Sequence, residues 1–354
     1  MTNINNFYFT VFHNNSKKLT RFVIILLIYK KSKVMRKVVL GRTEASVSAI
    51  SLGTWAFGGE NKSGKKSVGW ADQHDDDSYS ALLKAWSEGI NHWDTADVYG
   101  EGRSEKIIGK MWGSIQRESV FLATKVGWDM GPFPYWYNPD YMRTKIERSL
   151  INLKTDYIDL LYLHHCNFGK EDEYLESALD VLRSFQSEGK IRFIGLSDWS
   201  NERIVKYLDI CDPDVVQPYR NIMDNSYEKS GLKHIIDSRN LGVCFFSPIK
   251  HGLLTGKYKH PTYFKDGDHR SNIKDFQNEK ILRKILLNCE ELKKKFKNKK
   301  NPVLYGVVNA LFLDSPTSCV LLGQRNVEQV KVASSLGDVL SSEDTNWVKS
   351  LYNN

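Results

Sequence analysis

Three apolar segments of this sequence end in side chains that can exchange protons. Asp94 and Tyr99 follow the first segment, Lys125 ends the second and His164 ends the third. Any of these could be a turn or rim residue, but a lysine at the end of an apolar segment needs a partner, because a buried ammonium is costly. Together the four side chains predict proton donation by a phenol.

The roles follow from ordinary acid–base chemistry. A tyrosine has a pKa of about 10, too high for rapid proton donation at neutral pH. A neighbouring ammonium lowers the pKa of a phenol, and a carboxylate keeps that ammonium charged and in place. We therefore expect Tyr99 to be the acid, Lys125 the group that tunes it and Asp94 the anchor of Lys125.

The elements that must position these residues follow a repeating pattern, in which short apolar segments alternate with amphipathic windows. The expected strands are 49–54, 90–95, 120–126, 157–164, 191–197, 215–218, 242–247 and 318–323. The expected helices include 77–88, 105–112, 140–153, 173–188, 201–209, 230–239 and 280–296. The strand segments are continuous rather than alternating, which indicates burial on both faces of a parallel sheet.

Eight such β-then-α units predict a (β/α)8 TIM barrel, whose active site lies at the carboxyl ends of its strands. A hairpin within 38–48 should close the barrel bottom. The alternative is an open doubly wound sheet, which would need a G-x-G-x-x-G turn after its first strand. Gly53-Thr54-Trp55 does not continue in that way, so the barrel is favoured.

Composition divides the chain of 354 residues into three parts. Residues 1–34 are rich in Asn, Lys and Phe, with one short apolar run at 22–29. We expect an N-terminal extension that is disordered or not native, with Met35 as the natural start. A membrane-surface or targeting role is the alternative. Residues 35–340 should form the barrel and 341–354 a C-terminal tail.

Charge and cysteine content exclude several classes of protein. The net charge is +8, but residues 1–36 carry seven Lys and Arg and no acid, which leaves the remainder almost neutral. We therefore expect no nucleic-acid partner. The five cysteines are scattered without a CxxC pair, so we expect neither disulfides nor a metal site, and a reducing, cytoplasmic location. No run approaches the ~18 to 20 apolar residues of a membrane span.

Five motifs at the expected strand ends resemble those of the aldo-keto reductase superfamily. They are DTADVYGEGRSE (94–105), FLATKVG (121–127), YIDLLYLHH (157–165), GKIRFIGLSDWS (189–200) and FFSPIKHGLLTGKY (245–258). The resemblance runs from about residue 37 to 336. GTWAFGG and the inserted VGWADQHDDD are most similar to the bacterial general-stress and sugar-active branch.

The resemblance implies a carbonyl reductase with an Asp-Tyr-Lys-His tetrad, which falls on Asp94, Tyr99, Lys125 and His164. Hydride transfer would reduce an aldehyde, a ketone or a sugar-type carbonyl, with Tyr99 protonating the oxygen and a neutral His164 orienting it. The expected substrate-binding residues are Trp55, Tyr99, His164, His165 and Trp128. Polar neighbours such as Asp97, Arg103, Asn167 and Arg220 could grip substrate hydroxyls. We expect a small-molecule substrate and a monomer or small homo-oligomer.

The resemblance also implies a nicotinamide cofactor. The expected contacts are Gly53, Thr54, Trp55, Asp94, Ser197, Asp198, Gln217, Phe246, Ser247, Pro248, Ile249, Gly252, Leu254, Lys257, Gly323, Gln324, Arg325 and Gln329. Of these, Ser197, Asp198 and Gln217 would bind the nicotinamide carboxamide, and the contacts within 247–257 would line the pyrophosphate. Arg325 would receive the adenosine 2′-phosphate, because a guanidinium is always charged and can bind two oxygens, which favours NADPH over NADH. Three sites depart from the family pattern, since Asp198 replaces the usual Asn, Phe246 the commoner Tyr, and Val332-Ala333 the usual Glu-Asn pair at the adenine.

A second class of function is compatible with the same residues. Reductase-like β subunits of potassium channels bind the cofactor but act mainly as regulatory or sensor subunits, and they can retain the tetrad. The four residues therefore do not by themselves separate an enzyme from such a subunit.

Overall fold

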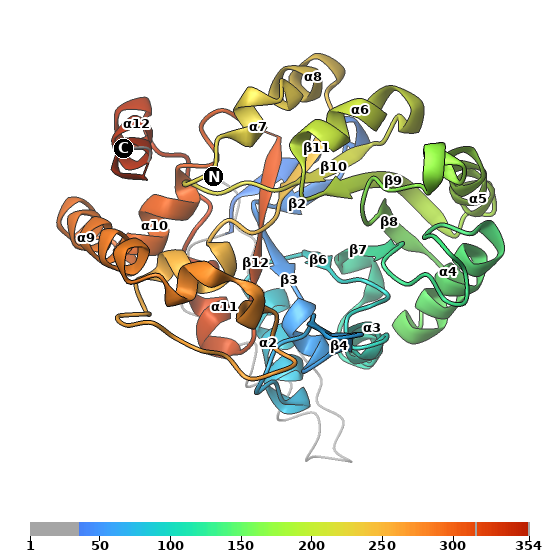
Figure 1. Ribbon diagram of the computed structural model, residues 1–354, viewed down its shortest axis with the longest axis horizontal. Coiled ribbons are helices and arrows are strands. Elements are labelled where there is room, and N and C mark those ends of the chain that lie inside the picture. Colours follow the sequence, from blue (N-terminus) through green and yellow to red (C-terminus); the bar gives the residue numbers. More distant parts are fainter. Residues whose placement is uncertain (1–34, 316, 353–354) are drawn as a thin grey trace, which may run out of the picture. The chain divides into compact units, whose positions relative to one another are not determined.

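The computed structural model describes residues 35–315 and 317–352 (Figure 1). The N-terminal extension predicted at 1–34 lies outside these residues. Eight parallel strands form a closed barrel in the order β10-β11-β12-β3-β6-β7-β8-β9, with β9 pairing to β10. The barrel strands are β3 (Ile50–Gly53), β6 (His92–Asp94), β7 (Phe121–Val126), β8 (Ile158–Leu163), β9 (Ile191–Asp198), β10 (Val215–Pro218), β11 (Gly242–Phe245) and β12 (Ser318–Gly323).

The predicted (β/α)8 barrel is therefore confirmed, and each predicted strand segment contains or matches one barrel strand. Every residue of β7 and β8 is buried, as expected for strands covered by helices on one face and by the barrel interior on the other. Two smaller hairpins complete the strands, β1 (Lys37–Val39) with β2 (Ser46–Ser48), and β4 (Lys62–Ser63) with β5 (Lys66–Ser67).

Helices surround the barrel in Figure 1 and account for the predicted amphipathic windows. They are α2 (Asp75–Ser87), α3 (Arg103–Gly109), α4 (Pro139–Leu153), α5 (Leu175–Ser187), α6 (Asn201–Cys211), α7 (Ser226–Lys229), α8 (Leu232–Arg239), α9 (Glu279–Lys295), α10 (Pro302–Asn309), α11 (Val327–Ala333) and α12 (Ser342–Tyr352). None of the helices in the described part of the chain is long and apolar enough to cross a membrane.

The sequence pattern does not predict α10, α11 or α12. The α10 sequence PVLYGVVN is apolar almost throughout, so it lacks the polar face that reveals an amphipathic helix. Residues 341–354, expected as a tail, contain α12, which packs against α9 and α10. Val348 and Tyr352 of α12 are buried there in a second apolar cluster outside the barrel core.

The loop between β11 and α9 crosses to the loop between β3 and α2, on the face where the strands end. Gly69 pairs with Asp268 in a parallel bridge, and the Asp268 carboxylate accepts a hydrogen bond from the Ala71 amide at 3.0 Å. Arg270 forms an ion pair with the same carboxylate. These contacts hold two long loops together at the mouth of the barrel.

The hairpin β1–β2 contacts the opposite end of the barrel, as the sequence predicts. Its turn residue Gly41 lies against the start of β11, and the Arg42 amide donates to the Asn240 carbonyl at 2.6 Å. Gly41 has φ +51°, and a Cβ at this position would lie 2.2 Å from the Gly242 nitrogen. This turn therefore requires glycine for both its conformation and its close approach.

We predict that Gly41→Ala lowers the free energy of unfolding by about 2 to 4 kcal/mol, because backbone strain and a steric clash act together. Urea unfolding would measure the change. Gly64→Ala is a matched control, since Gly64 has φ +58° but no atom within 4 Å of an added Cβ. Equal losses in the two variants would contradict the packing role of the hairpin turn.

Candidate active site

The predicted ion pair lies inside the mouth of the barrel. Asp94 is the last residue of β6, and Lys125 lies near the end of the neighbouring strand β7. The Lys125 ammonium donates to Asp94 Oδ1 at 2.5 Å and to the Thr95 carbonyl at 2.8 Å. Both side chains are only 1% exposed. A buried ammonium therefore has the paired carboxylate that its burial requires.

Tyr99 lies in the turn after β6, and its hydroxyl is 3.4 Å from the Lys125 ammonium. Two glycines position this turn, because the backbones of Gly58 and Gly100 approach so closely that a Cβ on Gly100 would lie 2.2 Å from the Gly58 carbonyl oxygen. The Trp55 ring stacks on the Tyr99 ring at a centroid distance of 5.9 Å. The structure thus places the predicted acid beside the group predicted to tune it.

The net direction of the Tyr99 pKa differs from the sequence-based expectation. Burial raises the pKa of the Tyr99 phenol above its ordinary value, and the opposing effect of Lys125 is smaller. The lysine behaves as predicted. Burial lowers the pKa of Lys125, but Asp94 and Tyr99 together outweigh burial and raise it, so this ammonium remains charged.

His164 follows β8 and faces the same site, with its ring centroid 6.0 Å from that of Tyr99. Burial first, and the nearby Lys125 charge second, hold the pKa of His164 well below the ordinary value of 6.5. The imidazole is therefore neutral at physiological pH. Its Nδ1 is buried and has no hydrogen-bond partner among the described residues.

His165, expected to contact substrate, has both ring nitrogens occupied by the protein. Nδ1 accepts a hydrogen bond from the Asn167 amide at 3.1 Å, and Nε2 donates to the Gly127 carbonyl at 2.9 Å. Burial lowers the pKa of His165 to about 4. The Trp128 ring lies 4.3 Å from it. The polar atoms of His165 therefore support the loop that carries Trp128.

The aromatic residues expected around the substrate do form walls. The ring centroid of Trp128 lies 6.0 Å from that of His164, and Trp128 is 41% exposed. On the other side the ring centroid of Trp55 lies 5.8 Å from that of Trp70 and 4.7 Å from that of His269. The tetrad thus lies between two aromatic surfaces, one from the loop after β7 and one from the loops after β3 and β11.

The residues predicted to bind the nicotinamide carboxamide are buried at the ends of β9 and β10. Ser197 Oγ donates to the Gln217 carbonyl at 3.1 Å, and Gln217 Nε2 donates to Asp94 Oδ2 at 2.8 Å. The Asp198 carboxylate accepts hydrogen bonds from the Cys166 and Ser200 amides. Asp198 and Gln217 therefore already have protein partners, and Gln217 extends the network of the tetrad.

Several features of this mouth fit a nicotinamide cofactor. Phe246 is partly exposed beside Trp199, with ring centroids 4.8 Å apart, which gives an aromatic surface for stacking. Gly323 at the end of β12 has no atom within 4 Å of an added Cβ, so space is open beside it. The neighbouring Gln324 has a buried Oε1 without a partner in the described part of the chain.

The predicted pyrophosphate segment has an unusual backbone. Ser247, Lys250 and His251 have φ values of +58°, +46° and +57°, and Gly252 has +95°. Non-glycine residues in this region are strained, and such strain concentrates at ligand-binding segments. The other predicted contacts of the segment are Pro248, Ile249, Leu254 and Lys257, of which Leu254 is fully buried.

Arg325, predicted to bind the 2′-phosphate, is held by the loop between β3 and α2. Its guanidinium donates to Gln73 Oε1 at 2.9 Å, to the Ala71 carbonyl at 2.6 Å and to the Asp72 carbonyl at 2.8 Å. The Gln329 side chain accepts a hydrogen bond from the Arg325 amide. The positive charge is thus positioned by neutral acceptors and is not neutralised by them.

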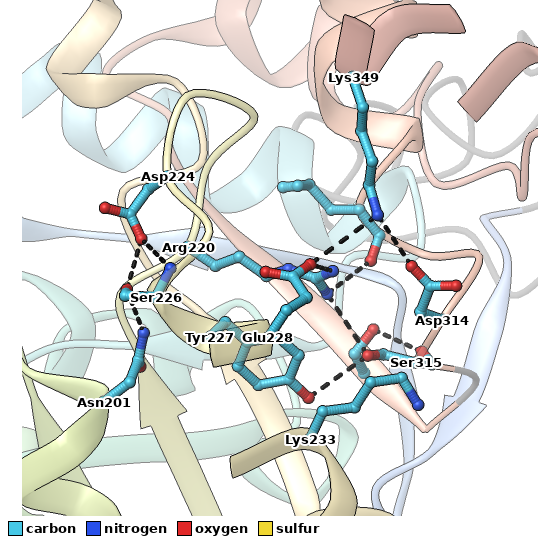
Figure 2. Close-up of polar contacts among 12 residues, drawn as sticks. Asn201, Arg220, Asp224, Ser226, Tyr227, Glu228, Lys233, Asp314, Ser315 and Lys349 are labelled. Atoms are coloured by element: carbon cyan, nitrogen blue, oxygen red, sulfur yellow. Dashed lines mark hydrogen bonds and ion pairs between the residues drawn. The ribbon is translucent and has the colours of Figure 1, made fainter. Parts of the chain in front are cut away.

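Arg220 follows β10 and was a candidate for gripping substrate hydroxyls. Figure 2 shows it between Glu228 and Ser315 instead. The guanidinium pairs with Glu228 at 2.6 Å and is 1% exposed. It also lies over the rings of Tyr227 and Phe245. The Arg220 guanidinium is therefore occupied by an ion pair with another side chain of the protein.

The structure brings together three side chains that sequence spacing could not connect. His92, Cys244 and Cys319 come from β6, β11 and β12, and their potential ligand atoms lie within 4.8 Å of one another. Cys319 Sγ is 3.3 Å from His92 Nδ1 and also contacts the Val243 carbonyl. The three residues form a polar cluster inside the barrel. The three residues lie far apart in the sequence, so no local sequence pattern reveals the cluster.

Comparison with known proteins agrees with this geometry. A sequence profile described as the aldo/keto reductase family matches residues 49–353. This chain belongs to the aldo/keto reductase family. It is 29% identical to aldo-keto reductase YhdN of Bacillus subtilis (strain 168) over 323 residues, which covers 88% of this chain and 92% of the relative.

A second relative is the NADH-specific methylglyoxal reductase of Escherichia coli (strain K12). It is 32% identical over 264 residues, covering 71% of this chain and 78% of the relative. Among solved structures, glycerol dehydrogenase AKR11B4 of Gluconobacter oxydans matches with a TM-score of 0.73 and 27% identity, over 89% of this chain and 94% of that one. Aldo-keto reductases are oxidoreductases that use nicotinamide cofactors.

We predict that Lys125→Met lowers the free energy of unfolding by about 3 to 5 kcal/mol, because it leaves the buried Asp94 carboxylate without a counter-charge. The double variant Asp94→Asn/Lys125→Met should recover part of that loss. Urea unfolding would measure both. The exposed Lys110 gives the control, since Lys110→Met should change stability by no more than about 0.5 kcal/mol. A Lys125→Met loss no larger than the control's would show that the pair does not hold this site.

Proposed function

We propose that this protein is an NADPH-dependent reductase of small aldehydes, ketones or sugar-type carbonyl compounds, with Tyr99 as the general acid. The observation that carries the proposal is that the Lys125 ammonium contacts both the Asp94 carboxylate and the Tyr99 hydroxyl in a buried site. A phenol close to a fixed ammonium can donate its proton, because the resulting phenolate is stabilised by the positive charge.

The cofactor would supply the hydride that the carbonyl carbon accepts. Tyr99 would donate its proton to the carbonyl oxygen, and Lys125 would stabilise the phenolate that remains. A neutral His164 suits the role of orienting the carbonyl oxygen by a hydrogen bond, since its low pKa prevents it from competing as a proton donor. Trp55 and Trp128 would exclude water and hold the substrate between them.

For the cofactor, Ser197, Gln217 and Phe246 would contact the nicotinamide, and residues 247–257 with Gly323 and Gln324 would contact the pyrophosphate and adenosine portions. Arg325 would receive the 2′-phosphate. Its support for NADPH is that a guanidinium held by neutral acceptors suits a dianion. The NADH-specific relative makes cofactor preference the part of the proposal that most needs a direct test.

We expect Tyr99→Phe to lower kcat by about 100- to 10,000-fold, because it removes the transferable proton and leaves the ring in place. The assay follows NADPH oxidation with methylglyoxal, nitrobenzaldehydes and aldoses as substrates. NADPH affinity, measured by fluorescence, should stay unchanged. Absence of turnover with the wild-type protein across this panel would favour the alternative of a cofactor-binding regulatory subunit.

We expect Arg325→Ala to weaken NADPH binding by about 10- to 100-fold, the loss of one or two charge-assisted hydrogen bonds. NADH binding should change by less than about threefold, because NADH has no 2′-phosphate. Fluorescence titration with each nucleotide measures both affinities. An equal loss for the two nucleotides would assign Arg325 a structural role through its contacts with the loop at 71–73.

A further inference from the structure

Lys145 connects two neighbouring segments of the candidate active site, the turn after β6 and the loop after β7. It lies on α4 and is 9% exposed. Its ammonium is 2.9 Å from Asp129 Oδ2, in the loop after β7, and 3.4 Å from Asp97 Oδ2, in the turn after β6. One buried cation thus faces two carboxylates from different segments.

The Asp129 side of this contact fixes the loop that carries Trp128. Tyr141 on α4 donates its hydroxyl to Asp129 Oδ2 at 2.8 Å, and the Gly131 amide donates to Asp129 Oδ1 at 2.9 Å. Burial raises the pKa of Asp129, but these hydrogen bonds and Lys145 outweigh burial and hold it below the usual value. Asp129 therefore stays ionised, and its loop is attached to α4.

The Asp97 side fixes the turn that carries Tyr99. Asp97 lies two residues before Tyr99, and its amide donates to the Lys125 carbonyl at 3.2 Å. Its side chain is 3% exposed, and neither carboxylate oxygen has a hydrogen-bond partner among the described residues. Lys145 is thus the cation that faces Asp97, at ion-pair rather than hydrogen-bond distance.

The charged groups around Asp97 make its ionisation difficult. Besides Lys145, it faces Glu105 on α3 and Asp129 after β7, both of which raise its pKa. Glu105 is fully buried, with its oxygens bonded to Thr124 and Asn152. Burial is the largest effect and raises the pKa of Asp97 to about 7, although Lys145 opposes it. Asp97 therefore changes charge near neutral pH.

The ammonium itself does not change charge in this range. Burial lowers the pKa of Lys145, but Asp97 and Asp129 outweigh burial and raise it. Below about pH 7 the cation consequently faces one ionised carboxylate, that of Asp129. Above about pH 7 the Lys145 ammonium faces two ionised carboxylates, those of Asp129 and Asp97. It then attracts the Tyr99 turn through Asp97, because a Coulombic interaction is strong in a site of low dielectric constant.

We propose that Lys145 is a positioning residue that ties the Tyr99 turn to the Trp128 loop through its contacts with Asp97 and Asp129. The inference deepens the proposed function and rests on it, because the two tied segments carry the acid and one aromatic wall. Because Lys125 still contacts the Tyr99 hydroxyl, loosening the tie should weaken substrate binding more than proton transfer.

The kinetic test compares Lys145→Met, Lys145→Arg and Asp97→Asn with the wild-type protein, with methylglyoxal as substrate and NADPH saturating. We expect Lys145→Met to raise the KM for methylglyoxal roughly tenfold at pH 8 and to lower kcat less than about threefold, since it removes binding rather than chemistry. Lys145→Arg should restore most of the KM. Arg148→Met, an exposed cation on the same helix, is the matched control.

The pH dependence separates this role from simple structural support. In the wild-type protein the KM should fall between pH 6 and pH 8, as Asp97 ionises and the tie strengthens. Asp97→Asn should remove that change and keep the higher KM throughout, because the amide cannot ionise. A wild-type pH dependence that persists in Asp97→Asn, or a KM for Lys145→Met within twofold of the control, would overturn the inference.

Hydrogen exchange tests the same tie without any turnover. At pH 8, Lys145→Met should accelerate amide exchange at both 96–99 and 127–131, whereas Arg148→Met should leave both segments unchanged. Circular dichroism would establish that each variant is folded, and Asp97→Asn, which removes the Tyr99 side of the tie, serves if Lys145→Met is not folded. Unaltered exchange of both segments in Lys145→Met would overturn the inference even if Tyr99→Phe supports the proposed reaction. Faster exchange in Lys145→Met, combined with a wild-type protein that turns over no carbonyl, would support the tie and reject the reaction.

Discussion

The buried ion pair between Lys125 and Asp94 is the interaction on which the geometry of the site depends. An ammonium that is 1% exposed cannot be hydrated, so it must take its partners from the protein. It finds them at Asp94 and the Thr95 carbonyl, with the Tyr99 hydroxyl close by. Gln217 then binds the other oxygen of Asp94, which extends the constraint from β6 and β7 across the barrel to β10.

The same burial controls the protons of the neighbouring groups, in opposite directions for acids and bases. It raises the pKa of Tyr99 and Asp97 and lowers that of His164, because a site poor in water disfavours whichever form is charged. The Tyr99 phenol therefore stays protonated, and the His164 imidazole stays neutral. The proposed donor role of Tyr99 therefore depends on the Lys125 ammonium, which opposes the effect of burial on the Tyr99 pKa, whereas a neutral His164 fits an orienting role.

The loops at the mouth of the barrel supply the aromatic side chains around the candidate active site. One pair of loops, joined through Asp268, Arg270 and Ala71, crosses the mouth beside Trp55. The loop after β7 brings Trp128 to the other side, where Asp129 attaches it to α4. Relatives with the same fold include an NADH-specific methylglyoxal reductase and a glycerol dehydrogenase. Fold alone therefore does not fix the substrate or the cofactor of a protein with this barrel.

Sequence alone determined the barrel, its eight strands and the four side chains at the strand ends, because each follows from a local pattern of apolar runs ended by polar residues. It did not reveal α10, which lacks a polar face, or the net pKa of Tyr99, which depends on burial. Nor could it show that His165 and Arg220 have protein partners, or that Lys145 faces Asp97 and Asp129. Those contacts join segments far apart in the chain, and only closure of the barrel and docking of its loops decide which polar atoms meet.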